Sequence, residues 1–504
     1  MLSLIKRLPS HAKAGLKRTL KLAGTILFGG LTMGIIIVVM MLNDRPDLKV
    51  WHKADLDEEF TKKSDIKTLD DYLELEDRLF AQLKKEVYDQ IDEIDQRALN
   101  RYYRGSLSDA SAWPQDWNRT WKRYPENPKS GFLLLHGMSD SPYSMRSLGE
   151  AVADGDTAIV ALRIPGHGTA PSGLLDTRWE DMAAAVRIAI DDLARAVGDG
   201  PISIIGYSNG GALAVEYALS AIEDRSLRMP EKLILLSPEI GVSKMAALAI
   251  WQSRLGHVLG LEKLAWNAIL PEYEPYKYGS FALNAARQAY RLTDSIRKRL
   301  KKARSRGTLA DFPPVLAFQS VVDATVSAPA LVEVLFNSLP VNGHELVLYD
   351  INRLTEAESI FAGNPTPGLD EMKAHSGHSF RLTILENKDG DSRELVERSR
   401  DPGSAVLETA DPQLSWPNGI YSLAHVALPF PETDPVYGGD AAERSPGRIQ
   451  IGNTIIRGER GVLLIPASTM LRLRWNPFYN YQQARILDFL GRSQPGGADQ
   501  PGRD

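Results

Sequence analysis

The stretch ISIIGYSNGGALAVEYALSAIE, residues 202–223, decides the fold of this chain. It opens with a mostly apolar run at 202–205, typical of a buried strand, and closes with a helical pattern at 212–222. Between them the residues GYSNG, 206–210, have the spacing G-x-S-x-G. Glycines flank the serine because a sharp turn from strand to helix leaves little room for side chains. Such a turn lifts the hydroxyl of Ser208 above the sheet, which predicts a nucleophile that a base can reach.

Short apolar runs alternate with helical segments on both sides of this turn. The apolar runs lie at 131–135, 158–162, 202–205, 233–236, 314–319 and 345–349. Helical patterns at 181–197 and 212–222 stand between some of them. Continuous apolar strands that alternate with helices are typical of parallel sheets buried on both faces. The sequence therefore predicts an α/β fold, a mostly parallel sheet covered by helices on both faces.

Two segments interrupt this rhythm and are interpreted as insertions. Residues 239–312 contain helical stretches, many aromatic residues and a basic run, but no clear strand, and are predicted to form a helical cap over the sheet. Residues 351–420 are irregular, with one strand expected at 380–386. The Gly/Pro-rich tail, 495–504, is expected to be disordered. The main domain is thus predicted to span residues 129–494.

A second motif follows the apolar run at 131–135. His136, Gly137 and Met138 stand where that run ends. An enzyme that attacks an acyl carbonyl must stabilise the negative oxygen of the tetrahedral intermediate, and two backbone N–H groups usually do so. The N–H of Asn209, directly after the serine, and the N–H of Met138 are the candidates for this oxyanion hole. His136 is expected to orient the loop.

Three stretches resemble proteins of the α/β-hydrolase superfamily. LLLHGMSDSPYSMRSL, residues 133–148, is similar to the oxyanion loop of bacterial carboxylesterases. RIPGHG, residues 163–168, resembles the RxPGHG segment of monoacylglycerol-lipase-like members, and GYSNGG, 206–211, resembles their nucleophile turn. The resemblance covers about residues 130–350 and implies a serine hydrolase of the α/β-hydrolase fold. Residues 1–128 and 351–420 depart from the small members.

The resemblance also implies the order of the catalytic triad, in which an acid and then a histidine follow the serine. Asp323 follows the apolar run at 314–319, in a stretch similar to the family's G-x-x-D-x-x-V acid loop. Ser320 stands where that pattern has glycine. Asp323 is therefore the candidate acid.

The catalytic histidine is sought by elimination, because the chain has nine histidines. Four remain once those near the N-terminus, in assigned loops and before Asp323 are set aside: His344, His375, His378 and His425. His344 begins an apolar run, at the wrong edge of the sheet. His425 lies in a near-apolar segment and is the favoured base. His378 is the alternative, since S-G-H is a common setting for a catalytic histidine, although it leads into the strand expected at 380–386.

The N-terminal region has the pattern of a membrane anchor. Residues 23–42 carry no charge, and a helix of that length spans about 30 Å, the hydrocarbon thickness of a bilayer. The basic tail at 1–22 has no acidic residue, which predicts a cytoplasmic N-terminus and a main domain on the other side, the periplasm in a Gram-negative bacterium. A cleaved signal peptide is the rival interpretation. Residues 43–128 are predicted to be a polar linker, to about 66, and a helical extension, with an amphipathic helix at 67–98.

Composition narrows the function further. A net charge of −5 gives no field that would attract nucleic acid, and the absence of cysteine excludes thiolate catalysis. Ser208, Asp323 and His425 predict hydrolysis of a carboxylic ester, from a small-molecule acyl ester or a lipid, with no cofactor or metal. The alternatives are a peptidase or thioesterase that uses the same triad, or an inactive hydrolase fold that serves as a binding module.

Overall fold

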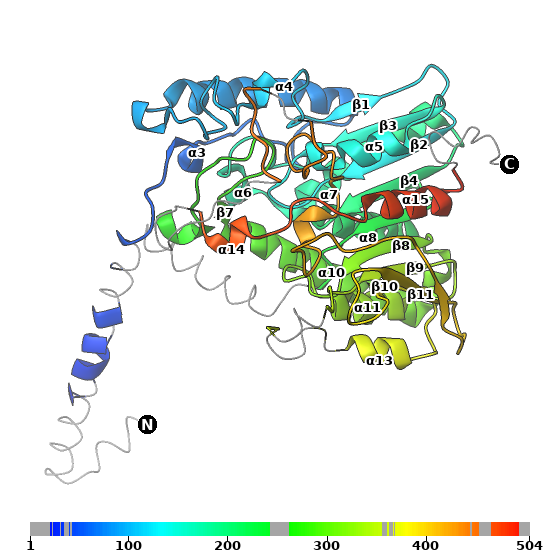
Figure 1. Ribbon diagram of the computed structural model, residues 1–504. Helices are drawn as coiled ribbons and strands as arrows, with labels where there is room; N and C mark the ends of the chain where they lie inside the picture. Colours follow the sequence, from blue (N-terminus) through cyan, green and yellow to red (C-terminus); the bar gives the residue numbers. More distant parts are fainter. Residues whose placement is uncertain are drawn as a thin grey trace, which may run out of the picture.

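The computed structural model describes residues 21–22, 24–30, 32–34, 40, 43–241, 262–354, 360–361, 366, 368–443, 446–452 and 465–492. One large sheet runs through the middle of the domain, and the N-terminal segment projects away from it (Figure 1). The predicted tail at 495–504 and most of the basic tail at 1–22 lie outside the described residues.

The sheet has ten strands, of which seven in a row are parallel. The parallel strands, in spatial order, are β3 (Thr157–Leu162), β2 (Ser130–Leu135), β4 (Ile202–Tyr207), β5 (Leu233–Leu236), β8 (Val315–Ser320), β9 (Glu345–Tyr349) and β10 (Arg381–Asn387). Antiparallel strands complete both edges: β1 (Trp121–Arg123) beside β3, and β11 (Leu395–Arg400) and β12 (Glu408–Ala410) beyond β10. The predicted, mostly parallel sheet is confirmed.

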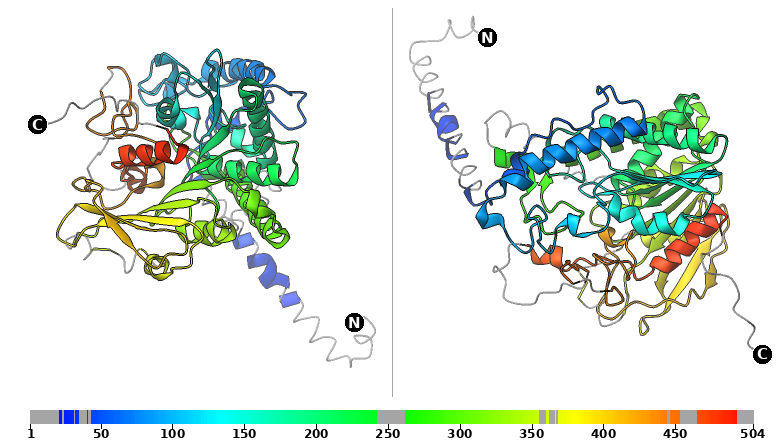
Figure 2. Two further views of the ribbon diagram at one scale, coloured as in Figure 1. Left: turned by 90° about the vertical axis from the view of Figure 1, so that its right-hand side faces the viewer. Right: turned by 90° about the horizontal axis from the view of Figure 1, so that it is seen from above.

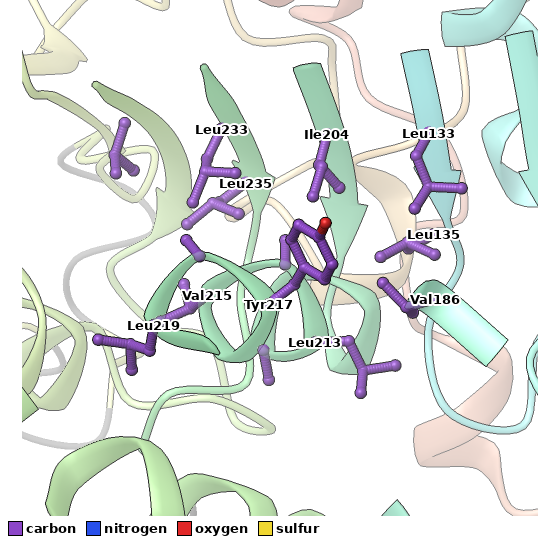
Figure 3. Close-up of a cluster of buried hydrophobic side chains, with 14 of the residues drawn as sticks. Leu133, Leu135, Val186, Ile204, Leu213, Val215, Tyr217, Leu219, Leu233 and Leu235 are labelled. Atoms are coloured by element: carbon purple, nitrogen blue, oxygen red, sulfur yellow. The ribbon is translucent and has the colours of Figure 1, made fainter. Parts of the chain in front are cut away.

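Helices cover both faces of this sheet, as Figure 2 shows. One face packs against α7 (Trp179–Val197), α8 (Asn209–Glu223), α10 (Leu283–Arg306) and α11 (Ala328–Val334). The other packs against α5 (Arg146–Val152) and α15 (Tyr479–Leu490). Successive residues of a strand point to opposite faces, so Leu133 and Leu135 of β2 join the first core, while Phe132 and Leu134 join the second. Figure 3 shows the first core, with Tyr217 and Leu213 of α8 beneath the strands.

The N-terminal extension is a helix laid against the first core. Helix α4 (Leu69–Glu86) is capped by Thr68, whose side chain accepts a hydrogen bond from the Asp71 N–H. The helix predicted at 67–98 is therefore too long by about three turns. The chain turns after Glu86, and Tyr88 packs edge-on against Tyr102. The apolar pattern beyond this point misled the prediction, because Ile94 is 63% exposed.

The predicted cap at 239–312 is not a single helical unit. After the described residues resume at 262, β6 (Trp266–Ala268) and β7 (Phe281–Ala282) form a two-stranded antiparallel sheet. Helix α10 then packs on α8, because its apolar face, including Leu292 and Ile296, joins the first core. The second half of the predicted cap is thus one of the layer helices, and its start at 242–261 lies outside the described residues.

The segment at 351–420 contributes to the sheet and is not merely an irregular insertion. The strand expected at 380–386 is confirmed as β10, and it runs parallel to β9. The prediction missed α13 (Leu369–Ala374), β11 and β12. The two strands were missed because neither is an apolar run. β11 reads LVERSR, and β12 reads ETA.

The predicted anchor at 23–42 is described in part. Residues 24–30, 32–34 and 40 are helical, and the rest of the segment lies outside the described residues. Among all the residues that the structure describes, we find no helix with both the length and the apolar character needed to cross a bilayer. The anchor therefore stays a prediction.

Candidate active site

Ser208 stands at the turn between β4 and α8. Its backbone has φ 53° and ψ −115°, a conformation that a residue with a side chain rarely adopts. The turn is held because the Ser208 N–H donates to the Leu236 carbonyl at 2.9 Å, and the Ser208 carbonyl accepts from the Glu239 N–H at 3.0 Å. Gly210 is required here, since a Cβ on it would lie 2.2 Å from the Leu135 carbonyl oxygen. The packing of the surrounding strands thus maintains the strain at Ser208.

The loop after β2 lies directly against this serine. A Cβ on Gly137 would fall 2.8 Å from the Tyr207 ring and 3.2 Å from the Ser208 Cβ, so only glycine allows this approach. The next residue, Met138, carries one of the two predicted oxyanion donors. Asn209, with the other, is the first residue of α8, where N–H groups have no partner inside the helix. No hydrogen bond from either N–H to an acceptor among the described residues is present.

His136 ties this loop to the loop after β3. Its Nε2 accepts from the Ile164 N–H at 3.0 Å, so the proton lies on Nδ1, which donates to the Gly137 carbonyl at 2.8 Å. Burial lowers the pKa of His136 well below its ordinary value, and the nearby His167 adds to this effect. His136 therefore stays neutral, consistent with the orienting role that we expected.

Asp323 lies in the loop after β8, at the same edge of the sheet as Ser208. One carboxylate oxygen accepts from the N–H groups of Thr325 and Val326 at 2.7 and 3.0 Å. The other accepts from Gln319 Nε2 at 2.9 Å and from His425 Nδ1 at 2.8 Å. Burial disfavours the charge, but His425 and the backbone donors outweigh it and hold the pKa of Asp323 at about 2. Asp323 is therefore an anion throughout the range in which proteins function.

His425 reaches Asp323 from 102 residues further along the chain. It begins the short 3₁₀ turn His425–Ala427, is 5% exposed, and its ring centroid lies 5.2 Å from that of Tyr207. Because Nδ1 faces the Asp323 carboxylate, Nε2 is the nitrogen that remains for a substrate or a nucleophile. The structure thus brings His425 and Asp323 together beside the residue that precedes Ser208.

The other candidate histidines lie elsewhere. His378 precedes β10, and because that strand is parallel to its neighbour, the residue stands at the edge of the sheet opposite to Ser208. Its Nε2 contacts the Met372 carbonyl at 3.1 Å. His344, at the start of β9, is buried and accepts from the Val315 N–H at 3.2 Å. His375 is exposed beside His378.

Glu239 is a buried carboxyl group that the sequence analysis did not single out. It follows β5, and its N–H donates to the Ser208 carbonyl. Burial raises its pKa to about 7, with a further contribution from the charge of Asp323. Its Oε2 has no partner among the described residues. The sequence does contain a signal for Glu239: it is a charged residue just after a buried strand, in Ser237-Pro238-Glu239.

A small pocket lies against Tyr207, whose ring also packs near that of His425. Its lining consists of charged and aromatic side chains and one valine: Asp140, Tyr207, Lys277, Val426, Phe430, Tyr437 and Arg474. In this structure it has room for about one water molecule. The buried hydroxyl of Tyr437 has no partner among the described residues. Across all the described parts of the chain, no group of three or more His, Asp or Glu side chains is arranged to hold a metal ion.

Comparison with known proteins finds one matching family. Residues 132–389, about half of the chain, match the model of the alpha/beta hydrolase family. A thermostable monoacylglycerol lipase from Bacillus sp. (strain H-257) is 35% identical over 95 residues, which are 19% of this chain and 37% of that protein. The chain therefore matches little more than a third of that relative's length. This match confirms, over those residues, the resemblance to monoacylglycerol-lipase-like proteins.

Solved structures are similar over a little under half of the chain. One comes from a study of LipS and LipT, two metagenome-derived lipolytic enzymes, at 20% identity and a TM-score of 0.36, covering 46% of this chain and 87% of that one. A soluble variant of monoglyceride lipase from Saccharomyces cerevisiae, bound to a substrate analogue, is 17% identical with a TM-score of 0.34, covering 46% and 81%. Est1E from Butyrivibrio proteoclasticus with ferulic acid is 19% identical with a TM-score of 0.32, covering 46% and 85%.

Proposed function

Because the chain belongs to the alpha/beta hydrolase family, we propose that it is a serine hydrolase that cleaves a carboxylic ester through an acyl-enzyme. The observation that carries the proposal is the 2.8 Å hydrogen bond between His425 Nδ1 and Asp323 Oδ2, beside the strained turn at Ser208. Acyl transfer through a serine requires three groups: a nucleophile, a base, and an acid that orients the base.

In the proposed reaction His425 Nε2 takes the proton of Ser208 while Oγ bonds to the ester carbonyl carbon. The N–H groups of Met138 and Asn209 bind the oxygen that becomes negative. When the tetrahedral intermediate collapses, the C–O bond to the alcohol breaks and His425 protonates the leaving oxygen. Water then attacks the acyl-enzyme, gives its proton to His425, and the acid leaves as Ser208 recovers its proton. Asp323 stays ionised, holds the imidazole tautomer and stabilises the imidazolium.

Labelling with a fluorophosphonate probe tests this proposal. The wild-type protein should be labelled, and Ser208→Ala should not. Ser237→Ala is the matched control, because Ser237 also ends a strand, is buried and has a positive φ of 40°. Equal labelling of Ser208→Ala and wild type would show that the nucleophile lies elsewhere, and an unlabelled wild type would favour a binding module. Labelled protein that cleaves peptides or thioesters but no ester would change the substrate class.

The proposal includes a membrane anchor at 23–42, with the main domain on the non-cytoplasmic side. Large apolar side chains of the described helical residues are exposed, among them Leu27 at 77% and Phe28 at 71%. The hydroxyls of Thr25 and Thr32 donate to carbonyls four residues earlier at 2.9 Å, so neither needs water. A reporter that is active only in the cytoplasm, fused after residue 504, should be silent. A strong signal would reverse the topology.

A further inference from the structure

The chain directly after the predicted anchor is docked onto the domain, although its polar composition predicted a linker. Arg45 donates to the carbonyl oxygens of Lys263 and Trp266, both at 2.8 Å, and of Asn267 at 3.2 Å. In return, Lys263 Nζ donates to the Arg45 carbonyl at 3.0 Å and to Asp47 Oδ1 at 2.8 Å. Five hydrogen bonds thus fix the start of this segment. We call residues 43–53 the strut and residues 262–282 the rim.

His52 provides a second connection between the strut and the rim. Its Nδ1 accepts from the Lys49 N–H at 3.0 Å, so its proton lies on Nε2, which donates to Ser280 Oγ at 2.9 Å. Burial lowers the pKa of His52 to about 3, and the charges of Lys49 and Lys53 add to this effect. The ring therefore stays neutral and keeps both hydrogen bonds, while it packs edge-on against Trp266 at 4.9 Å.

The rim in turn contacts the candidate oxyanion loop. The Tyr278 N–H donates to the Ser139 carbonyl at 2.8 Å, and Lys277 Nζ lies 3.7 Å from Asp140 Oδ2. One apolar cluster, built around Trp266 of the rim, includes both Leu48 of the strut and Met138. The strut, the rim and the oxyanion loop therefore pack as one continuous unit beside the candidate active site.

This unit lies close to the end of the predicted anchor. Only Asn43 and Asp44 lie between Leu42, the last residue of the uncharged stretch, and Arg45. Even fully extended, the three residue steps from Leu42 to Arg45 span only about 10 Å. Figure 1 shows the blue N-terminal helix leading to this side of the domain, near α3 (Val50–Lys53) and β7. A flexible linker would let the active site face any direction relative to the bilayer. The docked strut restricts that direction.

We propose that the rim faces the bilayer that holds the anchor, and that the substrate is an amphiphilic acyl ester drawn from that bilayer. The inference rests on the proposed esterase function and on the proposed anchor. The strut holds the oxyanion loop near the membrane surface, so an ester in the bilayer reaches Ser208 without crossing bulk water. An ester dissolved in water gains nothing from this arrangement.

The full chain in phosphatidylcholine vesicles tests the inference with two substrates. One is a long-chain monoacylglycerol placed in the same vesicles, and the other is water-soluble p-nitrophenyl acetate. The first variant inserts a Gly/Ser linker of about 12 residues between Leu42 and Asn43, which gives a flexible tether of about 20 Å and leaves the strut intact. The second is Arg45→Ala. The control is Lys67→Ala, whose exposed ion pair with Asp65 is remote from the rim.

Wild type should cleave both esters. The insertion and Arg45→Ala should lower cleavage of the monoacylglycerol by about tenfold or more. A longer or looser tether lowers the effective concentration of the active site at the bilayer surface. Cleavage of p-nitrophenyl acetate should stay within about twofold, which also shows that both variants fold. Lys67→Ala should change neither rate. The inference is wrong if the insertion leaves monoacylglycerol cleavage at the wild-type rate, or if wild type cleaves only the soluble ester. A wild type inactive on both esters would overturn the proposed function itself.

Discussion

Replacing Asp323 by asparagine separates the charge of this residue from its shape. Two donors from the backbone, the N–H groups of Thr325 and Val326, hold one carboxylate oxygen. Gln319 and His425 donate to the other. In Asp323→Asn the side-chain carbonyl can serve only one of these two pairs, and the amide NH₂ must face the other. The orientation of the amide therefore decides the outcome.

The side-chain carbonyl of Asp323→Asn should keep accepting from the backbone pair. Turning the NH₂ toward Thr325 and Val326 would break both backbone hydrogen bonds and leave the part-buried N–H of Val326 without an acceptor, at about 1–3 kcal/mol. With the carbonyl kept on the backbone pair, the NH₂ points at His425 Nδ1, which must then act as an acceptor. The imidazole proton moves to Nε2, so Nε2 cannot take the proton of Ser208. A base in the wrong tautomer lowers kcat by about 10⁴-fold.

Hydrolysis of p-nitrophenyl acetate measures this loss, and urea unfolding verifies that the variant folds. Asp311→Asn is the control, since Asp311 forms an exposed ion pair with Arg225 and should keep full activity. An Asp323→Asn variant within tenfold of wild type would show that Asp323 does not orient the base. A large loss accompanied by a lower urea midpoint would instead point to a damaged fold, and Asp323→Glu would then be compared.

Three further predictions follow from the same geometry. His425→Ala should match Ser208→Ala, with a loss of about 10⁴-fold in kcat, whereas His378→Ala should stay within a few-fold; the opposite result moves the base to His378. His167, whose pKa burial lowers from 6.5 to about 4, stays neutral while the unfolded chain binds a proton, so it should lower the free energy of unfolding as the pH drops from 6.5 to 4, by up to about 1.4 kcal/mol per pH unit, and the difference in that free energy between wild type and His167→Gln, measured by urea unfolding, isolates this contribution. A difference that does not change with pH there would contradict it. Glu239→Gln should remove an inflection near pH 7 from the pH profile of kcat/KM, because Glu239 loses its proton there beside Asp323; an unchanged profile would mean that Glu239 does not influence the site.

The sequence predicted the parts of the site that short stretches encode. The turn at Ser208 needs only the residues around it, because the strand, the glycines and the helix are consecutive. The family and the parallel sheet were likewise predicted from local runs and motifs, and both are confirmed. The choice between His378 and His425 could not rest on local pattern, since it depends on the direction of β10, which its pairing with β9 sets.

What the sequence could not predict depends on partners far along the chain. The strut looked like a linker because its residues are polar, and its partners at the rim lie more than 200 residues away. β11 was missed because one of its faces carries charges: Arg398 pairs with Glu386 of β10. Glu239 looked like any acidic residue after a strand, and only burial against Ser208 and Asp323 distinguishes it.

The closing contacts of the domain join its two ends. Arg492 donates to Ser130 Oγ at 2.8 Å and to the Val152 carbonyl at 2.6 Å, more than 330 residues earlier. His425 itself meets Asp323 only after another hundred residues have left the ribosome. A ribosome that adds about 5–20 residues per second therefore releases β2, β4 and Ser208 many seconds before His425, the proposed base, is added. In the proposed mechanism the nascent chain thus carries Ser208 without its base for most of its synthesis.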